Sequence, residues 1–222
     1  MELSDVDWLI NLSRKRKPRK EPTKKDAILR AAQELFGRQG YSGTTVKQVA
    51  ERAGVAFGLV AHYFGNKETL FLTAGFDMAD RLLARLRKAT DASPTGLEAV
   101  AAFVSTYLGY TEEHRRRFPV LIRCSPFSDV PNMLDRERIA AKFQEIFAVI
   151  QRCVARGVQD GTIRGVPEEE TAALVFSNIM GAVRTRFLTP YALPGLYRET
   201  VRYVVRSLAT DVEAALKVAE KP

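Results

Sequence analysis

The chain has 222 residues, of which 46% are hydrophobic and 27% are charged, and its formal net charge is +8. These values are ordinary for a globular protein of one or two domains with a substantial core. No apolar run approaches the roughly 18 residues that a membrane-spanning helix needs. At the N-terminus the acidic and apolar residues precede the basic cluster, the reverse of a secretory signal, so we expect a cytoplasmic protein without a membrane partner.

Cysteine and histidine are scarce. Cys124 and Cys153 lie far apart, and the chain holds only two histidines. A metal site needs more ligands than these residues offer, so we expect no metal and no cofactor. The two cysteines are expected to be buried thiols, with a redox disulfide as the alternative.

Positive charge is concentrated near the N-terminus. Residues 14–67 contain 13 Lys or Arg against 4 Asp or Glu. Such an excess on one segment is typical of proteins that bind a polyanion, although any single cluster could also be a solvated charge run.

Residues 1–22 are expected to form a flexible N-terminal segment. The first 13 residues have too few apolar positions to fold alone, and they are either disordered or docked on the body. Residues 14–20 hold six basic residues, and Pro18 and Pro22 disfavour a helix, which indicates a basic arm. This arm either reaches into a DNA minor groove or adds only non-specific attraction to phosphates. Its candidate DNA-binding residues are Arg14, Arg16 and Arg19.

The first helix is predicted over residues 23–39, with an apolar face and Gly40 as its end. Residues 44–67 then read TTVKQVAERAGVAFGLVAHYFGNK. Apolar residues at helical spacing predict one helix after Thr45, which can form a capping box with Gln48. Gly54 can take the positive φ of a sharp helix exit, and a second helix is predicted over 56–64. A helix, a glycine-containing turn and a helix are typical of the helix-turn-helix motif.

The run from about residue 23 to residue 67 resembles the DNA-binding domain of the tetracycline-repressor (TetR) family of bacterial transcription regulators, and three blocks carry the resemblance. They read AILRAAQELFGRQGY, TTVKQVAERAGV and HYFGNKETLF, in this order. The resemblance covers roughly a fifth of the chain, and the alternative is a helical hairpin in an unrelated all-α protein.

The resemblance implies DNA contacts at the start of the first motif helix, along the second, recognition helix, and at the residue that follows it. The implied DNA-binding residues are Thr45, Lys47, Phe57, Gly58, Leu59, Ala61, His62, Tyr63 and Lys67. The chain departs from the family pattern, which commonly has an aromatic residue at position 61 and polar residues at positions 57 and 59. The recognition helix is therefore expected to make few hydrogen bonds to base edges. Contacts with thymine methyl groups, close approach at Gly58 and shape readout are expected to contribute more to sequence recognition. His62 and Tyr63 either contact phosphate or pack on the next helix.

The rest of the chain is predicted to be helical, because no strand-like alternation occurs. The helices are expected at 67–89, 97–117, 132–159, 167–187 and 195–218, and the segment 119–131, interrupted by prolines, is expected to be irregular. The predicted fold is all-α: a three-helix helix-turn-helix domain (23–68), joined by a long helix to a larger regulatory and dimerisation domain (69–218).

The last two predicted helices are apolar on two sides, which indicates either a large internal core or a second partner. In the resembling family these helices form a four-helix dimer bundle, which implies a homodimer on a palindromic operator in double-stranded DNA. The resemblance also implies a small-molecule effector in the helical body. Candidate lining residues, with ordinary core packing as the alternative for each, are Phe103, Tyr107, Tyr110, Phe118, Phe127, Phe143 and Phe147.

The sequence therefore predicts a homodimeric repressor, associated with the nucleoid, that a small molecule releases from its operator. The alternative is a ligand-independent DNA-binding architectural or partner-recruiting protein. An enzyme is disfavoured because no nucleophile–base pair, metal-ligand cluster or glycine-rich phosphate loop is present.

Overall fold

The computed structural model describes residues 23–125, 135–191, 193–211 and 213. Over these residues the chain is helical, with one isolated antiparallel bridge between Ile163 and Ala209 and no named strand, so the predicted all-α class is confirmed. No helix among them is long and apolar enough to cross a membrane. In chain order the helices are α2 (Lys24–Gln39), α3 (Val46–Ala53), α4 (Phe57–Phe64), α5 (Lys67–Asp91), α6 (Gly96–Glu113), α7 (Pro119–Arg123), α8 (Arg136–Gln159), α9 (Glu168–Leu188) and α10 (Leu196–Leu208).

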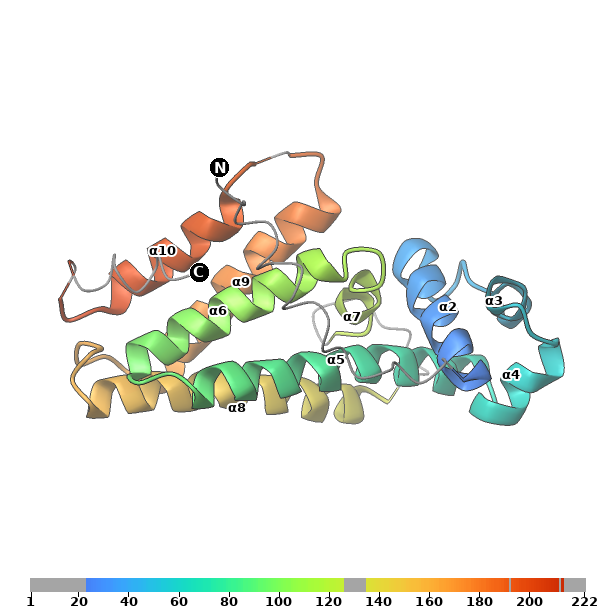
Figure 1. Ribbon diagram of the computed structural model, residues 1–222, viewed down its shortest axis with the longest axis horizontal. Helices are drawn as coiled ribbons and strands as arrows, with labels where there is room; N and C mark the ends of the chain where they lie inside the picture. The colour runs from blue at the N-terminus through green and yellow to red at the C-terminus, as the bar shows by residue number, and fades with distance from the viewer. Residues whose placement is uncertain (1–22, 126–134, 192, 212, 214–222) are drawn as a thin grey trace, which may run out of the picture.

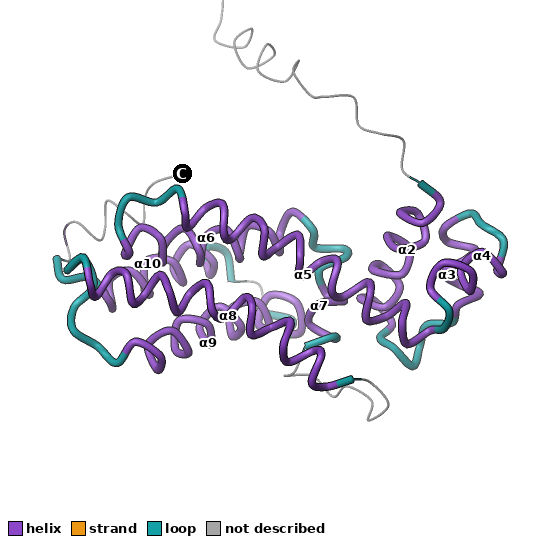
Figure 2. Tube along the Cα trace, turned by 90° about the horizontal axis from the view of Figure 1, so that it is seen from below, coloured by secondary structure: helices purple, strands orange, loops and turns teal. Residues whose placement is uncertain are grey.

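The helices are arranged along one long axis. α2, α3 and α4 lie together at one end, and α5 runs from them into the body (Figure 1). α6 and α8 pack on the far part of α5, α9 and α10 pack on α6, α8 and each other, and a view from below shows the same separation (Figure 2). α5 is thus the one long helix that contacts both groups of helices.

Local capping explains where several helices begin. Thr23, Thr45 and Thr95 each form a capping box with the residue three positions later. In this arrangement two backbone N–H groups at the helix start gain side-chain acceptors. α3 ends at Gly54, whose φ of 66° is left-handed, as expected for the turn of the motif.

The segment 119–131 is not irregular throughout, and the prediction is wrong for its first part. Pro119 occupies the first position of α7, where its missing N–H costs nothing, and Val120 and Leu121 of this short helix are buried. The helix packs on α2 and α5, which is a tertiary contact that the local proline pattern does not reveal. Residues 126–131 lie outside the described residues.

The last helix is shorter than predicted. α10 ends at Leu208, where Ala209 leaves the helix and forms the bridge to Ile163. The backbone N–H of Arg164 donates to the Leu208 carbonyl at 3.0 Å, which ties the end of α10 to the turn after α8. Residues 214–218 of the predicted helix lie outside the described residues.

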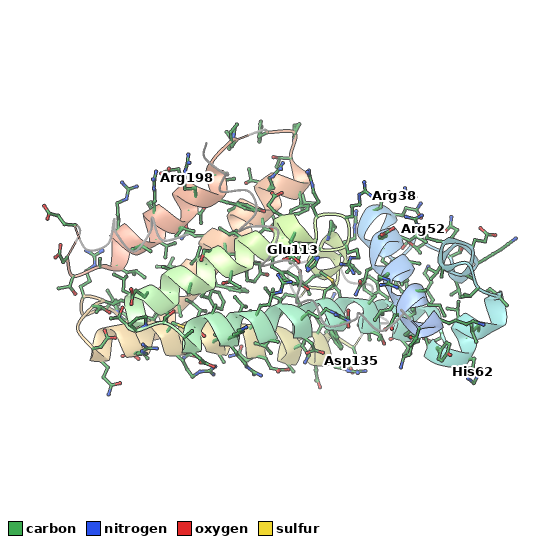
Figure 3. The ribbon with its side chains drawn as sticks, viewed as in Figure 1. Arg38, Arg52, His62, Glu113, Asp135 and Arg198 are labelled. Atoms are coloured by element: carbon green, nitrogen blue, oxygen red, sulfur yellow. The ribbon has the colours of Figure 1, made fainter. Side chains whose placement is uncertain are left out.

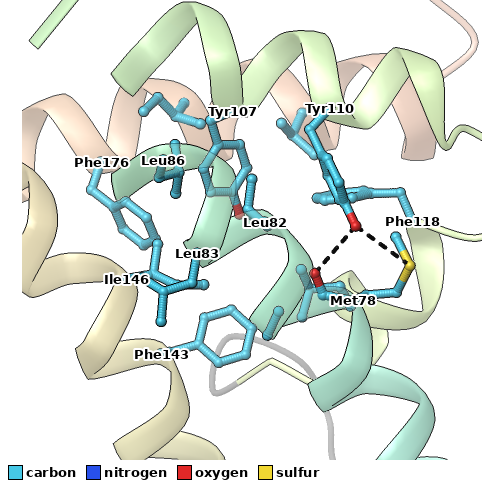
Figure 4. Packing of buried hydrophobic residues seen from close by; sticks show 14 of the residues in the cluster. Met78, Leu82, Leu83, Leu86, Tyr107, Tyr110, Phe118, Phe143, Ile146 and Phe176 are labelled. Carbon is cyan, nitrogen blue, oxygen red and sulfur yellow. Dashed lines mark hydrogen bonds between the residues drawn. The ribbon is translucent and has the colours of Figure 1, made fainter. Parts of the chain in front are cut away.

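The core of the body is formed by α5, α6, α8 and α9 (Figure 4). Tyr107 and Tyr110 of α6 and Phe118 are among its largest fully buried side chains. The Tyr110 hydroxyl donates to the Met78 carbonyl of α5 at 3.4 Å.

Cys124 and Cys153 are free and buried, which confirms the expected pair of thiols. Burial raises the pKa of Cys124 to about 12 and that of Cys153 to about 11, so both remain protonated at neutral pH. A structural rather than a reactive role follows for both residues.

Candidate nucleic-acid interface

Helix α4 presents one face to the core and the opposite face to solvent. Val60 and Phe64 are buried and hold the helix on α2, α3 and α5. Phe57, in the first turn of the helix, is 58% exposed, and Tyr63, in its last turn, is 40% exposed. A large aromatic side chain that stays exposed in a small domain costs favourable burial, so it points to a contact surface.

The start of α4 is open. Ala56 gives no side-chain hydrogen bond to the helix N-terminus, so the first backbone N–H groups have no side-chain cap. A Cβ added to Gly58 would meet no atom within 4 Å. The backbone of this exposed, uncapped first turn can therefore come into direct contact with another molecule.

The start of α3 differs, because its cap is complete. The Thr45 hydroxyl oxygen accepts from the Gln48 N–H at 3.2 Å, and the Gln48 side chain accepts from the Thr45 N–H at 2.8 Å. These two bonds occupy two backbone N–H groups at the end of the helix where DNA contacts by Thr45 and Lys47 are predicted. Lys47 is exposed beside them, which leaves its side chain accessible to a DNA phosphate.

Two lysines flank α4 from neighbouring helices. The Lys67 ammonium, at the first position of α5, lies 4.4 Å from the centroid of the Tyr41 ring. The Lys25 ammonium of α2 lies 6.0 Å from the Phe64 ring. Figure 3 shows His62 of α4 at this end of the molecule and Arg198 of α10 toward the other.

Polar contacts join α2 to α5 and to α7. The buried Gln33 side chain of α2 donates to the Asp77 carboxylate of α5 at 2.8 Å, and Arg81 pairs with the same carboxylate at 2.9 Å. About one turn further along α2, Arg123 of α7 donates to the Gly37 carbonyl at 2.9 Å. A displacement of α5 or α7 would therefore be transmitted to α2.

Comparison with known proteins identifies this end of the molecule. The family model for "Bacterial regulatory proteins, tetR family" matches residues 28–74, which include α3, α4 and the start of α5. The chain carries a TetR-family DNA-binding domain. The match extends over the three blocks from which the sequence predicted the same family.

Curated relatives that align over most of the chain have low sequence identity to it. The chain is 24% identical over 148 residues to the transcriptional repressor KstR2 of Mycolicibacterium smegmatis, covering 66% of this chain and 71% of the relative. It is 28% identical over 174 residues to the repressor AcnR of Corynebacterium efficiens, covering 76% of this chain and 84% of the relative. These relatives are transcription regulators, not enzymes.

Solved structures share the whole TetR-like fold. The regulator PfmR of Thermus thermophilus has a TM-score of 0.68 at 22% identity, over 83% of this chain and 98% of that one. FadR of Bacillus subtilis, solved in complex with stearoyl-CoA, has a TM-score of 0.68 at 21% identity, over 81% and 96%. At these identities the likeness establishes the fold of the chain.

Within this TetR-like domain, the structure brings the residues predicted on α4 to one exposed end. Phe57, Gly58, Ala61, His62 and Tyr63 are all exposed, whereas Leu59 is half-buried. The His62 and Tyr63 rings meet edge to face at 5.3 Å and remain open to solvent. Their phosphate contact stays a prediction. Arg14, Arg16 and Arg19 of the predicted arm lie outside the described residues.

Lys25 was missed by the sequence reasoning. It lies near the start of α2, between the predicted basic arm and the predicted helix-turn-helix motif. The signal was present as the Lys24–Lys25 pair directly after Thr23, since cations beside the recognition helix favour a phosphate contact.

The predicted ligand-lining aromatics do not all meet at one place. A cavity of about 20 Å³ in the body is lined by Tyr107, Phe118 and Phe143, together with side chains of α7 and α9. Phe103 and Tyr110 are buried elsewhere in the core, Phe147 packs on Phe176, and Phe127 lies outside the described residues. Burial raises the pKa of Tyr107 above its usual range, so its hydroxyl stays neutral at the cavity wall.

Lys67→Ala is expected to weaken binding to specific and to random DNA by similar factors. A lysine at a helix N-terminus is disfavoured by the helix dipole, and a DNA phosphate placed there would offset this cost. Removing one phosphate contact should lower the slope of log K against log salt by about one. Lys88→Ala, at the other end of α5, is the control and should leave the slope unchanged. An unaltered slope for Lys67→Ala would remove this residue from the interface.

Proposed function

We propose that this protein is a homodimeric transcription repressor that binds a palindromic operator through α4 and is released from it by a small molecule bound in the helical body. One observation carries the proposal. Among the described residues, the exposed large hydrophobic side chains gather in two places, on α4 and on the α9–α10 surface. They are Phe57 and Tyr63 on α4, and Leu174, Leu188, Tyr191, Leu193 and Tyr203 on or between α9 and α10.

The first group fits a DNA-reading surface. An α-helix fits the major groove, where apolar side chains contact thymine methyl groups. One helix of eight residues supplies few base contacts. Two copies reading half-sites about 34 Å apart would supply enough contacts for specific binding, so this mode of readout favours a dimer.

The second group, which we call the α9–α10 surface, fits the contact between the two copies. Leu174 is 65% exposed on α9, and Tyr203 is 58% exposed on α10. Along the Leu174 face of α9, Ser177, Asn178 and Gly181 are small or short and exposed, which allows another helix to approach closely. This surface lies at a distance from α4 along the molecule, so a dimer formed there leaves both recognition helices open (Figure 1).

The double variant Leu174→Glu, Tyr203→Glu is expected to be a monomer. Each carboxylate would be buried without a partner in the dimer, which costs far more than its exposure in the monomer. Sedimentation velocity should show a dimer for the parent chain and a monomer for the variant, and the variant's operator affinity should fall at least about 100-fold. Ala140→Glu on α8 places the same charge on an exposed position elsewhere and should remain dimeric. A variant that stays dimeric would exclude this surface.

Release by a ligand requires only that the ligand favour one arrangement of the two α4 helices over the other. The contacts that join the body to α2 through Asp77 and Arg123 supply the mechanical connection. The second candidate function is that of a ligand-independent DNA-binding protein. For both candidates the proposed location is the nucleoid in the cytoplasm. The size of the body's cavity favours this second candidate. At about 20 Å³ the cavity has room for about one water molecule and not for a larger ligand.

A further inference from the structure

The first part of α4 carries a patch of exposed apolar and small residues. It consists of Phe57, Gly58 and Ala61, which are all exposed. Residues three or four positions apart are neighbours on a helix surface, so Phe57 and Gly58 both lie beside Ala61. Val60 and Leu59 belong to the same stretch but hold the helix on the core, since Val60 is buried and Leu59 packs against it half-buried. Because α4 lies at the end of the molecule away from the body, this patch is open to a partner (Figure 1).

Phe57 is held less firmly by the protein than the other exposed aromatic residue of α4. The Tyr63 ring packs edge to face on the His62 ring at 5.3 Å and on the Phe64 ring at 6.4 Å. In the part of the chain that the structure describes, the Phe57 ring contacts neither another ring nor a cation, and 58% of the residue is exposed. Its apolar surface therefore remains available, and burying it against a partner would be favourable.

The patch offers no hydrogen bond from a side chain. Residues 57–61 read FGLVA, and the first side chain of α4 that can donate or accept is that of His62. In a helix-turn-helix the N-terminal residues of the recognition helix are the ones that contact base edges. The side chains of the patch can therefore distinguish one base from another only through apolar contact.

The major groove presents one apolar group, the C5-methyl group of thymine. The remaining groups on the base edges are hydrogen-bond donors and acceptors, which an apolar side chain would remove from water without giving them a new partner. A Cβ added to Gly58 would meet no atom within 4 Å, and Ala61 carries only a methyl group. These two small residues leave room beside Phe57 into which a methyl group of the DNA fits.

We propose that Phe57, together with Ala61, reads the C5-methyl group of a pyrimidine, and that this methyl group determines specificity at its position, rather than the hydrogen-bonding pattern of the base pair. The inference rests on the proposed function, because it names the chemistry of the operator that α4 recognises. One consequence distinguishes it from ordinary recognition of a T·A pair. 5-Methylcytosine carries a methyl group at the same place in the major groove, so methylation of cytosine at this position would strengthen binding.

The test begins with a duplex that the full chain selects from a random pool. Each thymine of the half-site is replaced in turn, in both half-sites together, by deoxyuridine, which lacks only the methyl group. At one position the replacement should weaken binding about 4-fold for each methyl group, and so roughly 15-fold for the two half-sites. At that position a 5-methylcytosine·guanine pair should bind tighter than cytosine·guanine by a similar factor. Fluorescence anisotropy measures all four affinities.

Phe57→Ala separates reading of the methyl group from a general contribution of this side chain to binding. The ratio of the affinities for the thymine and deoxyuridine duplexes should fall from roughly 15-fold to less than about 4-fold. Phe57 is largely exposed, so circular dichroism should show an intact fold. Tyr63→Ala is the matched control, because it removes the other exposed aromatic side chain of α4. It should change the affinity for both duplexes by the same factor and leave their ratio unaltered.

Three results would overturn the inference: no thymine of the half-site responds to deoxyuridine, methylation of cytosine leaves binding at the responding position unchanged, or the ratio in Phe57→Ala equals that of the parent chain. If the chain still binds a palindromic duplex specifically, any of these results refutes reading of the methyl group alone. If no specific duplex is selected from the pool, the proposed repressor itself is refuted.

Discussion

Gly58→Glu is expected to abolish specific DNA binding while leaving the fold intact. Gly58 is in the exposed first turn of α4, and a side chain there meets no other atom of the protein within 4 Å. A glutamate near a helix N-terminus is favourable for folding, because it complements the helix dipole. In the major groove the same carboxylate would face DNA phosphates and occupy the space through which the backbone approaches the bases. The operator affinity should fall at least about 100-fold, which corresponds to about 3 kcal/mol.

Fluorescence anisotropy with a labelled operator measures this loss, and circular dichroism checks the fold. Gly109→Glu is the matched control, because Gly109 is also helical, exposed and without a neighbour within 4 Å of its added Cβ. It lies on α6 in the body, so its operator affinity should remain that of the parent. Specific binding retained by Gly58→Glu would show that α4 does not approach DNA through its first turn.

Gly96→Ala is expected to destabilise the fold by roughly 3 kcal/mol or more. Gly96 is the first residue of α6, and a Cβ at this position would overlap the backbone of Gly157 near the end of α8. Backbone atoms cannot move aside as a flexible side chain can. Separation of the helices would also weaken the bond from the Gly96 N–H to the Asp160 carboxylate, which is 2.7 Å long.

Chemical denaturation followed by circular dichroism, at equal protein concentrations, measures this effect. Gly109→Ala in the same helix is the control, since it introduces the same methyl group where no atom lies within 4 Å. Its gain in helix propensity should stabilise the chain by about 0.5–1 kcal/mol. Equal stability of the two variants would contradict the close approach of α6 and α8.

The helix-turn-helix could be predicted because its signals are local. The capping box of Thr45 and Gln48 and the left-handed turn at Gly54 are encoded within a few residues, and both are present in the structure. The opposite holds for α7, where Pro119 suggested irregular structure. Its helix depends on burial of Val120 and Leu121 against α2 and α5, which are distant in sequence.

The residues that line the cavity of the body could not be predicted from the sequence for the same reason. Aromatic residues at helical spacing indicated a core but not which of them would line a cavity. Tyr107, Phe118 and Phe143 meet because α6, α8 and the turn before α7 converge, and Met180 and Val183 of α9 complete the wall. A cleft lined by Arg38, Arg123 and Arg184 had no local signal in the sequence, because these residues lie on three separate helices and meet only in the folded chain.

Sequence-specific reading of DNA by a dimer of this chain can be tested directly. The experiment is selection of bound duplexes from a random pool, with purified protein at moderate salt. We predict a palindromic motif with two half-sites, whose centres are separated by about one turn of the double helix or a multiple of it. Recovery of only AT-rich or featureless DNA would contradict sequence-specific readout and favour a protein that binds DNA through its charge alone.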